Sequence, residues 1–303
     1  MQEFRADVLT GLARKQKCVP SKYFYDEEGS RLFEEICTAP EYYPTRTEKA
    51  LLQSLTPDLA EIVEPGTALV EFGSGSCVKT RILLDGIDNI AAYVPIEICE
   101  NWVMDCAAEL GEAYPHLAVW PVAADFMEPV TLPPELADAP RLGFFPGSTI
   151  GNLTVDDAVK FLKTARAGLG PKAKLLLGVD MQKDIDMLLA AYDDAGGITR
   201  DFNKNMLVRL NRELEANFDL ESFRHRAVWN DEAKRVEMHL QSRAVQTVSV
   251  AGKDFRFAEG ETIHTENSHK YTIAGFAAMA EKAGWHLARQ WTGQPGFAVL
   301  LLE

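Results

Sequence analysis

Three acidic side chains stand where apolar segments of the chain end. Glu71 lies near the end of the apolar run Ala68–Phe72, Glu97 ends the next such run, and Asp125 follows the third. A carboxylate in these places can bind a ribose diol or accept a hydrogen bond from an adenine amino group. The small-residue turn Gly73–Ser76 directly follows Phe72, and glycines let a backbone approach a ligand closely. Together these residues predict a nucleoside-containing cofactor rather than a plain strand-to-helix turn.

The turn has no phosphate-binding signature. A phosphate loop needs Gly-x-x-x-x-Gly-Lys-Ser/Thr, and Lys79-Thr80 does not have that spacing. The pyrophosphate pattern Gly-x-Gly-x-x-Gly is also absent. The pattern Glu-x-Gly-x-Gly-x instead favours S-adenosylmethionine, which carries no phosphate, although Cys77 replaces its last small residue. We expect Phe126, the apolar neighbour of Asp125, to flank the adenine ring.

A second small-residue loop, Gly147–Leu153, follows the fourth predicted strand. In a methyltransferase this position faces the acceptor, and the two glycines again allow close approach. The Asn152 amide offers both donor and acceptor atoms, which suit an amine or a carboxylate. The alternative is a turn that caps the next helix, with Asn152 as a loop residue.

The segment Thr262–Tyr271 is dense in hydrogen-bonding side chains. If it is extended, Glu266 and Ser268 lie on one face and could bind a ring that bears two N–H groups. A solvated strand is the other interpretation. His264 and His269 suggest a metal ion, but no third ligand is clustered with them along the chain, so we predict no metal site.

The elements that position these residues alternate strand and helix. Apolar runs and amphipathic segments alternate between residues 68 and 179, which predicts a parallel sheet with helices on both faces. Ligands of such sheets lie at the carboxyl ends of the strands. The third strand is expected at Ala118–Val122. Between Arg224 and Ile263 apolar and polar residues alternate, which indicates antiparallel strands and a separate lobe. The two last strands, His286–Thr292 and Phe297–Leu302, are expected as an antiparallel edge of the sheet.

Whole-chain numbers exclude several classes of protein. The chain has 303 residues and a net charge of -14, which argues against nucleic acid as a partner. No apolar run approaches the roughly 20 residues of a membrane span, and the N-terminus does not resemble a signal peptide. The five cysteines form no Cys-x-x-Cys pair and suggest reduced thiols. We therefore expect a cytoplasmic protein that contacts no membrane.

The chain resembles the histidine Nα-methyltransferases of ergothioneine biosynthesis over nearly its whole length. The shared motifs, as they stand here, are Lys22-Tyr23-Phe24-Tyr25-Asp26, Pro40-Glu41-Tyr42-Tyr43-Pro44-Thr45-Arg46, Glu71-Phe72-Gly73-Ser74-Gly75-Ser76, Gly147-Ser148-Thr149-Ile150-Gly151-Asn152-Leu153, Ala191-Tyr192-Asp193-Asp194, Asn211-Arg212-Glu213-Leu214 and Thr265-Glu266-Asn267-Ser268. The tyrosine-proline and Gly-Ser-Thr-Ile-Gly-Asn motifs are specific to this family and its close relatives. Glu97 stands where relatives often have Asp, which changes the reach of the carboxylate and not its role.

The resemblance implies an α/β fold: a class I S-adenosylmethionine-dependent methyltransferase sheet, Rossmann-like, with a second α+β substrate-binding lobe. It places the methyltransferase (cofactor-binding) domain at residues 46–182 and 271–303, and the substrate-binding lobe at residues 1–45 and 183–270. It further implies three successive methylations of the α-amino group of L-histidine, giving hercynine. We expect a monomer with this small-molecule substrate.

The resemblance also assigns site residues. It implies cofactor contacts by Gly73, Lys79, Glu97, Asp125 and Phe126. It implies histidine contacts by Tyr42, Gly147, Asn152, Tyr192, Met238, Glu266 and Ser268. In this assignment Glu266 and Ser268 hold the imidazole near Met238, and Asn152 and Tyr192 hold the amino and carboxylate end.

Methyl transfer depends mainly on how the protein positions the two reactants, because a neutral amine attacks the sulfonium methyl in line. The amine must first lose a proton, and Tyr25, expected near the amine, or a bound water is the candidate acceptor. Tyr25 and Asn152 are therefore the predicted catalytic residues. Two alternatives stay open: a methyltransferase of the same fold that acts on another amino acid or imidazole-containing acceptor, and a non-catalytic S-adenosylmethionine-binding protein.

Overall fold

The computed structural model describes residues 2–303 and separates into two compact units. The first unit combines the segment that ends at Tyr43 with Lys183–His269, and the second combines Pro44–Gln182 with Lys270–Glu303. Each unit is thus built from two separate stretches of the chain. No helix among residues 2–303 is long and apolar enough to cross a membrane.

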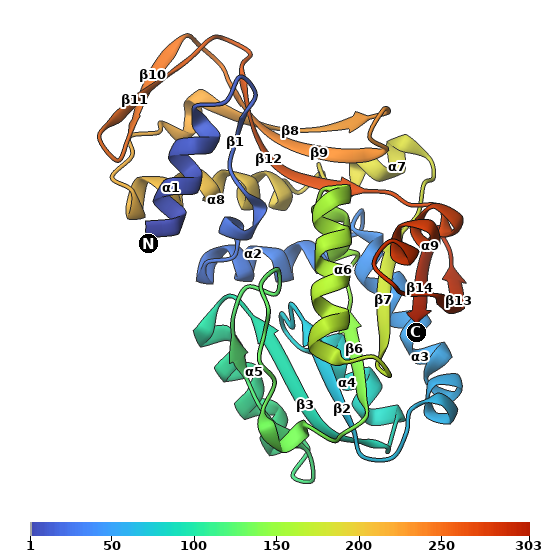
Figure 1. Ribbon diagram of the computed structural model, residues 1–303. Coiled ribbons are helices and arrows are strands. Elements are labelled where there is room, and N and C mark those ends of the chain that lie inside the picture. The colour runs from blue at the N-terminus through green and yellow to red at the C-terminus, as the bar shows by residue number, and fades with distance from the viewer. Residues whose placement is uncertain (1) are drawn as a thin grey trace. The chain divides into compact units, whose positions relative to one another are not determined.

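The second unit is organised around one mostly parallel sheet with the strand order β13-β14-β7-β6-β2-β3-β4 (Figure 1). Its strands are β2 (Thr67–Phe72), β3 (Ile90–Glu97), β4 (Ala118–Val119), β5 (Val122–Ala123), β6 (Arg141–Phe145), β7 (Lys174–Asp180), β13 (Leu287–Gly293) and β14 (Phe297–Leu302). β2 pairs in parallel with β3 and β6, and β6 with β7, whereas β14 pairs antiparallel with β7 and β13. The predicted antiparallel edge is confirmed.

Helices cover both faces of this sheet. They are α3 (Tyr43–Ile62), α4 (Val78–Gly86), α5 (Glu100–Ala113), α6 (Val155–Leu169) and α9 (Ile273–Glu281), with the 3₁₀ turns η2 (Pro134–Leu136) and η3 (Thr149–Asn152). Because side chains alternate along β2, Val70 packs in a core with Phe161 of α6 and Phe276 of α9. Leu69 packs in a second core with Leu52 of α3 and residues of α4 and α5. The expected α/β layers are confirmed.

The third predicted strand differs from the expectation. The structure has two short strands, β4 and β5, in place of one strand over Ala118–Val122, and both pair with β3. Trp120 and Pro121 separate them. Proline has no N–H to donate to a strand ladder, which explains the interruption. Asp125 follows β5.

The first unit contains an antiparallel-rich sheet of order β1-β12-β9-β8 and a separate β10–β11 hairpin. The strands are β1 (Lys17–Cys18), β8 (Phe223–Asn230), β9 (Arg235–Ser242), β10 (Gln246–Val250), β11 (Lys253–Phe257) and β12 (Thr262–His269). β12 pairs antiparallel with β9, with a register shift between His264 and Glu266. The change to antiparallel strands in this region is as predicted.

The helices of the first unit pack on one side of this sheet. They are α1 (Gln2–Leu12), α2 (Glu27–Thr38), α7 (Ile185–Ala190) and α8 (Ile198–Glu213), with the 3₁₀ turns η1 (Ser21–Phe24) and η4 (Leu220–Ser222). Their apolar faces form one core with alternate residues of β9, including Met238. Asp26 caps α2 by accepting from the Gly29 amide at 2.8 Å, and it also accepts from Asn205 and Arg212 of α8. This carboxylate fixes the chain directly after Tyr25.

One prediction about cysteine is wrong. The sequence suggested scattered reduced thiols, but the structure pairs Cys77 with Cys106 in a disulfide, with a Cα–Cα distance of 6.6 Å. Cys77 ends the glycine turn and Cys106 lies on α5, so the fold brings them together although they are far apart in sequence. Cys18, Cys37 and Cys99 are not part of this disulfide.

Candidate active site

The glycine turn after β2 has a backbone that few side chains tolerate. Gly73 and Gly75 adopt φ values of 73° and 49°, in the left-handed region. A Cβ on Gly73 would lie 3.7 Å from the Phe126 ring, an ordinary contact, so the backbone conformation and not space selects glycine there. Cys77, at φ 56°, is the cap residue before α4. The turn at the carboxyl end of β2 therefore depends on glycine for its backbone conformation.

Glu97 is bound to this turn. Its carboxylate accepts from the Gly75 amide at 3.3 Å and from the Ile98 amide at 2.8 Å, at the end of β3. Burial raises the pKa of Glu97 above its ordinary value, although these amide bonds favour the charged form. The structure thus brings Gly73, Phe126 and Glu97 together at the ends of neighbouring strands, as the sequence predicted.

The other two adenine-side residues lie beside them along the chain. The Asp125 carboxylate accepts from the Met127 amide at 2.9 Å, which fixes its direction after β5. The Phe126 ring makes edge contacts with Phe145 at 5.2 Å and with Phe161 at 5.6 Å between ring centroids. These contacts anchor one side of the ring in the core. The predicted contact of Phe126 with adenine stays a prediction.

Glu71 does not take part in this surface. Its carboxylate is buried and accepts from the Thr80 and Tyr93 hydroxyls. Burial raises the pKa of Glu71 to about 8. The side chain therefore points into the core between β2, β3 and α4, and its role is structural.

Lys79 lies in a buried polar cluster that the sequence did not reveal. Its ammonium is 2.6 Å from the Glu48 carboxylate, and both Glu48 oxygens accept from the Gly147 amide at 2.8 and 3.0 Å. Glu48 is fully buried on α3, and Gly178 of β7 leaves room for it, because a Cβ there would lie 2.0 Å from its carboxylate oxygen. Glu48 thereby links α3, α4 and the Gly147 loop.

The loop that carries Asn152 is held from two further sides. Ser148, at φ 57°, accepts through its hydroxyl from the Asp180 amide at 2.8 Å. The Tyr271 hydroxyl donates to the Ile150 carbonyl at 3.3 Å. Asn152 lies at the end of η3 and is partly exposed. These bonds make the loop a defined support for the Asn152 amide, and its predicted contact with substrate stays a prediction.

The remaining predicted acceptor residues gather in the first unit. The Tyr192 and Ser268 hydroxyls are 2.6 Å apart, and the Tyr192 ring meets the Tyr42 ring edge-on at 6.3 Å. Glu266 lies opposite Met238 in the β12–β9 register, and both side chains are buried. The structure therefore collects one carboxylate, one aliphatic hydroxyl and two phenols around a thioether.

The residues around Tyr42 shift the pKa of its hydroxyl. Burial, and then the neighbouring Tyr192, Cys37, Tyr25 and Glu266, raise the pKa of Tyr42 well above its ordinary value. Tyr42 is therefore a neutral hydrogen-bonding phenol at physiological pH. Tyr25 belongs to the same aromatic group, with its ring centroid 5.8 Å from that of Phe33.

A hydrogen-bond chain that the sequence did not indicate supports Tyr192. The His225 ring donates through Nε2 to the Tyr192 carbonyl at 2.8 Å, and its Nδ1 accepts from Asn203 at 2.8 Å. The Asn203 oxygen accepts from the Thr265 hydroxyl at 2.8 Å. Asn203 is fully buried on α8, so this chain couples α8 and β8 to the residue before Glu266. Thr265 belongs to the family motif Thr265-Glu266-Asn267-Ser268, whereas the sequence of α8 gives no sign that Asn203 has this role.

The sheet order and the helices on both faces give the fold of S-adenosylmethionine-dependent methyltransferases. A solved S-adenosylmethionine-dependent methyltransferase from Clostridium acetobutylicum superposes with a TM-score of 0.50 at 10% identity, over 85% of this chain and 91% of that one. This likeness concerns the fold alone.

The family follows from the sequence comparisons. The family model described as histidine-specific methyltransferase, SAM-dependent, matches residues 4–303. The chain is 40% identical to the histidine N-alpha-methyltransferase of Mycolicibacterium smegmatis over 300 residues, 97% of this chain and 92% of the relative. It is also 40% identical to the protein of that name from Mycobacterium tuberculosis over 297 residues, 96% and 92% of the two chains. The chain belongs to the SAM-dependent, histidine-specific methyltransferase family, which confirms the resemblance, the fold class and the cofactor predicted from its motifs.

Proposed function

We propose that this chain transfers three methyl groups from S-adenosylmethionine to the α-amino group of L-histidine, giving hercynine. The cluster of Glu266, Ser268, Tyr192 and Tyr42 carries the proposal, with the 40% identical histidine N-alpha-methyltransferases in support. An imidazole has two ring nitrogens that can both donate when it is protonated, and one that donates when it is neutral. A buried carboxylate and hydroxyl side by side match that pattern.

The acceptor roles are divided among short polar groups. Glu266 and Ser268 bind the imidazole, and Met238, opposite Glu266, packs against its face. Tyr192 and Asn152 bind the amino and carboxylate end, with Gly147 as the backbone lining. The Tyr192 hydroxyl now meets Ser268 at 2.6 Å, so it can exchange this partner for the substrate.

The donor roles rest with the glycine turn and its neighbours. The open backbone at Gly73 and the anchored Glu97 suit a ribose without phosphate. Asp125 and Phe126 hold the adenine, and the Lys79 ammonium suits the carboxylate of the methionine part. When bound, the cofactor supplies an electrophilic methyl group on a sulfonium.

The remaining work of the protein is orientation and one proton transfer. The acceptor amine enters as an ammonium and must become neutral before it can act as a nucleophile. Tyr25, or a water bound beside it, accepts that proton. The aromatic side chains of Tyr42, Tyr25 and Phe33 lie in one group and can stabilise the methylated, cationic amine by cation–π attraction.

Isothermal titration calorimetry with L-histidine in the presence of S-adenosylhomocysteine tests this assignment. Histidine should bind the native chain, and Glu266→Ala should abolish that binding. Glu259→Ala, an exposed carboxylate in the same unit, is the matched control and should bind as the native chain does. Absent histidine binding, or binding unchanged by Glu266→Ala, would sink the proposal.

The same reasoning assigns the two units. We assign cofactor binding to the unit with Pro44–Gln182 and most of the acceptor contacts to the unit with Lys183–His269. We further propose a monomer in the cytoplasm. Light scattering on the purified chain and fractionation of cells that express it check these two points.

A further inference from the structure

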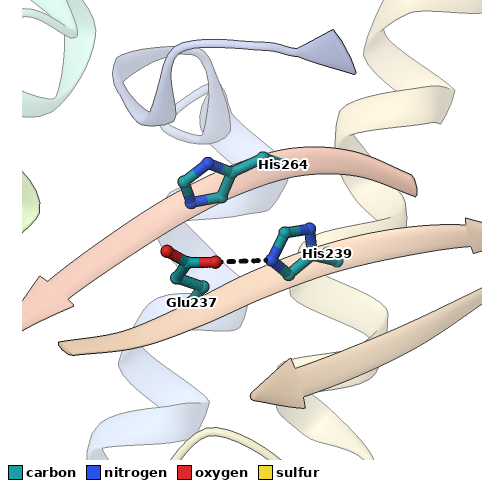
Figure 2. A group of neighbouring side chains, drawn as sticks. All are labelled: Glu237, His239 and His264. Atoms are coloured by element: carbon teal, nitrogen blue, oxygen red, sulfur yellow. Dashed lines mark hydrogen bonds and ion pairs between the residues drawn. The ribbon is translucent and has the colours of Figure 1, made fainter. Parts of the chain in front are cut away.

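The antiparallel pairing of β9 and β12 places three metal-ligating side chains together. His264 lies directly opposite His239 in the register, and Glu237 shares a face with His239 because it is two residues away. One nitrogen of each ring and one carboxylate oxygen lie within 4.8 Å of one another (Figure 2). The sequence-based prediction of no metal site considered only His264 and His269. It missed Glu237 and His239, which strand pairing places beside His264.

The carboxylate is oriented by its neighbours. One Glu237 oxygen accepts from Asn230 at 2.8 Å and from Arg235 at 2.8 Å, and the other is 3.0 Å from His239 Nε2. Burial opposes ionisation of Glu237, but these hydrogen bonds lower its pKa to about 2. The side chain therefore has one oxygen fixed by Asn230 and Arg235 and the other directed at the histidine.

Both rings are largely buried among the side chains around them. Burial lowers the pKa of His239, and burial together with the charge of His239 lowers that of His264. A neutral imidazole and a carboxylate are the protonation states that ligate a metal ion.

One ring atom lacks a partner. His239 Nδ1 is buried and has no hydrogen bond to any residue in the described range 2–303. A buried polar atom without a partner costs free energy, and native structures contain few of them. Because Glu237 is already engaged through Nε2, the side chains around the ring do not satisfy both of its nitrogens. Nε2 is therefore the nitrogen that faces Glu237, and Nδ1 is a second atom of the ring that could carry a proton.

We propose that Glu237, His239 and His264 bind a divalent transition-metal ion of the Zn²⁺ type. Two imidazoles and one carboxylate leave a fourth tetrahedral position for water. Metal–ligand bonds of about 2.0–2.1 Å place neighbouring ligand atoms roughly 3.3 Å apart, close to the 3.0 Å between Glu237 and His239 Nε2. The ion thus takes the place of the proton between these two atoms, and the neutral ring then carries its proton on Nδ1.

The ligands also select the kind of ion. Mg²⁺ and Ca²⁺ prefer several oxygen ligands, whereas imidazole suits Zn²⁺, Ni²⁺ and Cu²⁺. Arg235 pairs with Glu237 at 2.6 Å, and Arg226 lies opposite His239 on β8. Because these two arginines are positively charged, they disfavour a cation that binds only by electrostatic attraction and forms no bonds to imidazole nitrogens. The two rings are stacked, with centroids 4.8 Å apart and planes at 19°, and one ring would have to turn to aim its nitrogen at the shared ion.

A bound ion would join β9 to β12 at the register shift just before Glu266. His264 now donates to the Glu266 carbonyl at 3.0 Å, so the site and the segment with Glu266 are directly linked. A ligand that binds only the folded chain stabilises it in proportion to the logarithm of its concentration over Kd. The proposed ion would therefore stabilise the pairing of β9 with β12.

The test uses the full chain freed of metal by a chelator and then dialysed. Zn²⁺ is added while a chromophoric chelator competes, and thermal unfolding is followed with and without Zn²⁺. The variants are His264→Gln and Glu237→Gln. His116→Gln, an exposed histidine outside the cluster, is the matched control. Circular dichroism before the titration shows that each variant is folded.

The native chain and His116→Gln should bind one tight Zn²⁺ and unfold at a higher temperature with it. Loss of an outer-shell partner alone weakens metal binding roughly 10–100-fold, so loss of a ligand in His264→Gln should raise Kd by about tenfold or more and remove the thermal shift. Mg²⁺ should not compete. Zn²⁺ binding that is weak, or that has the same affinity and stoichiometry in His264→Gln, would show ordinary surface carboxylate binding and overturn the proposal.

Discussion

The Lys79 ammonium lies 2.6 Å from a Glu48 carboxylate whose side chain is completely buried. The same carboxylate accepts from the Gly147 amide, so one acid on α3 orients both a predicted cofactor residue and the loop that leads to Asn152. Removing its charge leaves the lysine without its counter-ion in a site that excludes most water. Glu48 is therefore a positioning residue for Lys79 and for the Gly147 loop.

Glu48→Gln should lower the free energy of unfolding by about 3 kcal/mol, the usual cost of breaking a buried ion pair. Glu61→Gln, an exposed acid on the same helix, is the control and should change it by less than about 0.5 kcal/mol. Urea unfolding at neutral pH measures both variants. Equal stability of the two variants would contradict the role given to Glu48.

Glu71 predicts a pH dependence of stability. Burial raises its pKa to about 8 in the folded chain, above the ordinary value of 4.5 that the unfolded chain retains. The folded state therefore holds a proton that the unfolded state has lost, so this contribution to stability is complete below pH 4.5 and is lost as the pH rises toward 8. Each unit of pKa difference is worth about 1.4 kcal/mol.

Glu71→Gln removes this titration. Its stability relative to the native chain should rise between pH 5.5 and pH 8, as measured by urea unfolding at several pH values. The difference between the two chains isolates Glu71 from other carboxylates, such as Glu237, whose pKa is shifted downward. A difference that is flat across this range would mean that Glu71 is ionised in the folded chain.

Gly73→Ala separates backbone strain from cofactor binding. An alanine at φ 73° costs about 1–2 kcal/mol of stability, because its Cβ crowds the neighbouring carbonyl. Gly66→Ala, at φ 78° and with nothing within 4 Å of the added Cβ, should cost the same. Only Gly73→Ala should also weaken S-adenosylhomocysteine binding, roughly tenfold, as measured by calorimetry. Equal cofactor affinity in the two variants would remove the glycine turn from the cofactor site.

Asn203→Ala tests the support of Tyr192. The substitution breaks the bonds to His225 and Thr265, and a buried group that loses its partner costs about 1–3 kcal/mol. Histidine should bind roughly tenfold more weakly, whereas S-adenosylhomocysteine binding should not change. Arg200→Gln, an exposed position on α8, serves as the comparison. If the affinities for both ligands fall together, the effect is a general loss of folding.

The sequence predicted what depends on local pattern. Alternating strands and helices, the glycine turn, and carboxylates at strand ends are all local, so Gly73, Glu97 and Asp125 could be placed before the structure. Glu71 was also grouped with these acids, and its neighbours on the next strand and helix turned it into the core instead.

The residues that were missed depend on partners distant in sequence. Glu48 is one acid on an amphipathic helix, and its burial requires the absence of a side chain at Gly178 on β7. Likewise, His239 faces His264 only because of the β9–β12 register, and Cys77 meets Cys106 only through the packing of α5. Single-strand patterns do not encode register or pairing, so these sites required three-dimensional information.

The central claim is that the acceptor is the α-amino group of histidine. The direct measurement is mass spectrometry of L-histidine after incubation with the chain and S-adenosylmethionine, with fragmentation to locate the added groups. The account predicts products with one, two and finally three methyl groups, all on the α-nitrogen, and their loss in Asn152→Ala while that variant still binds the cofactor. Unmodified histidine, methylation of an imidazole nitrogen, or full turnover by Asn152→Ala would contradict it.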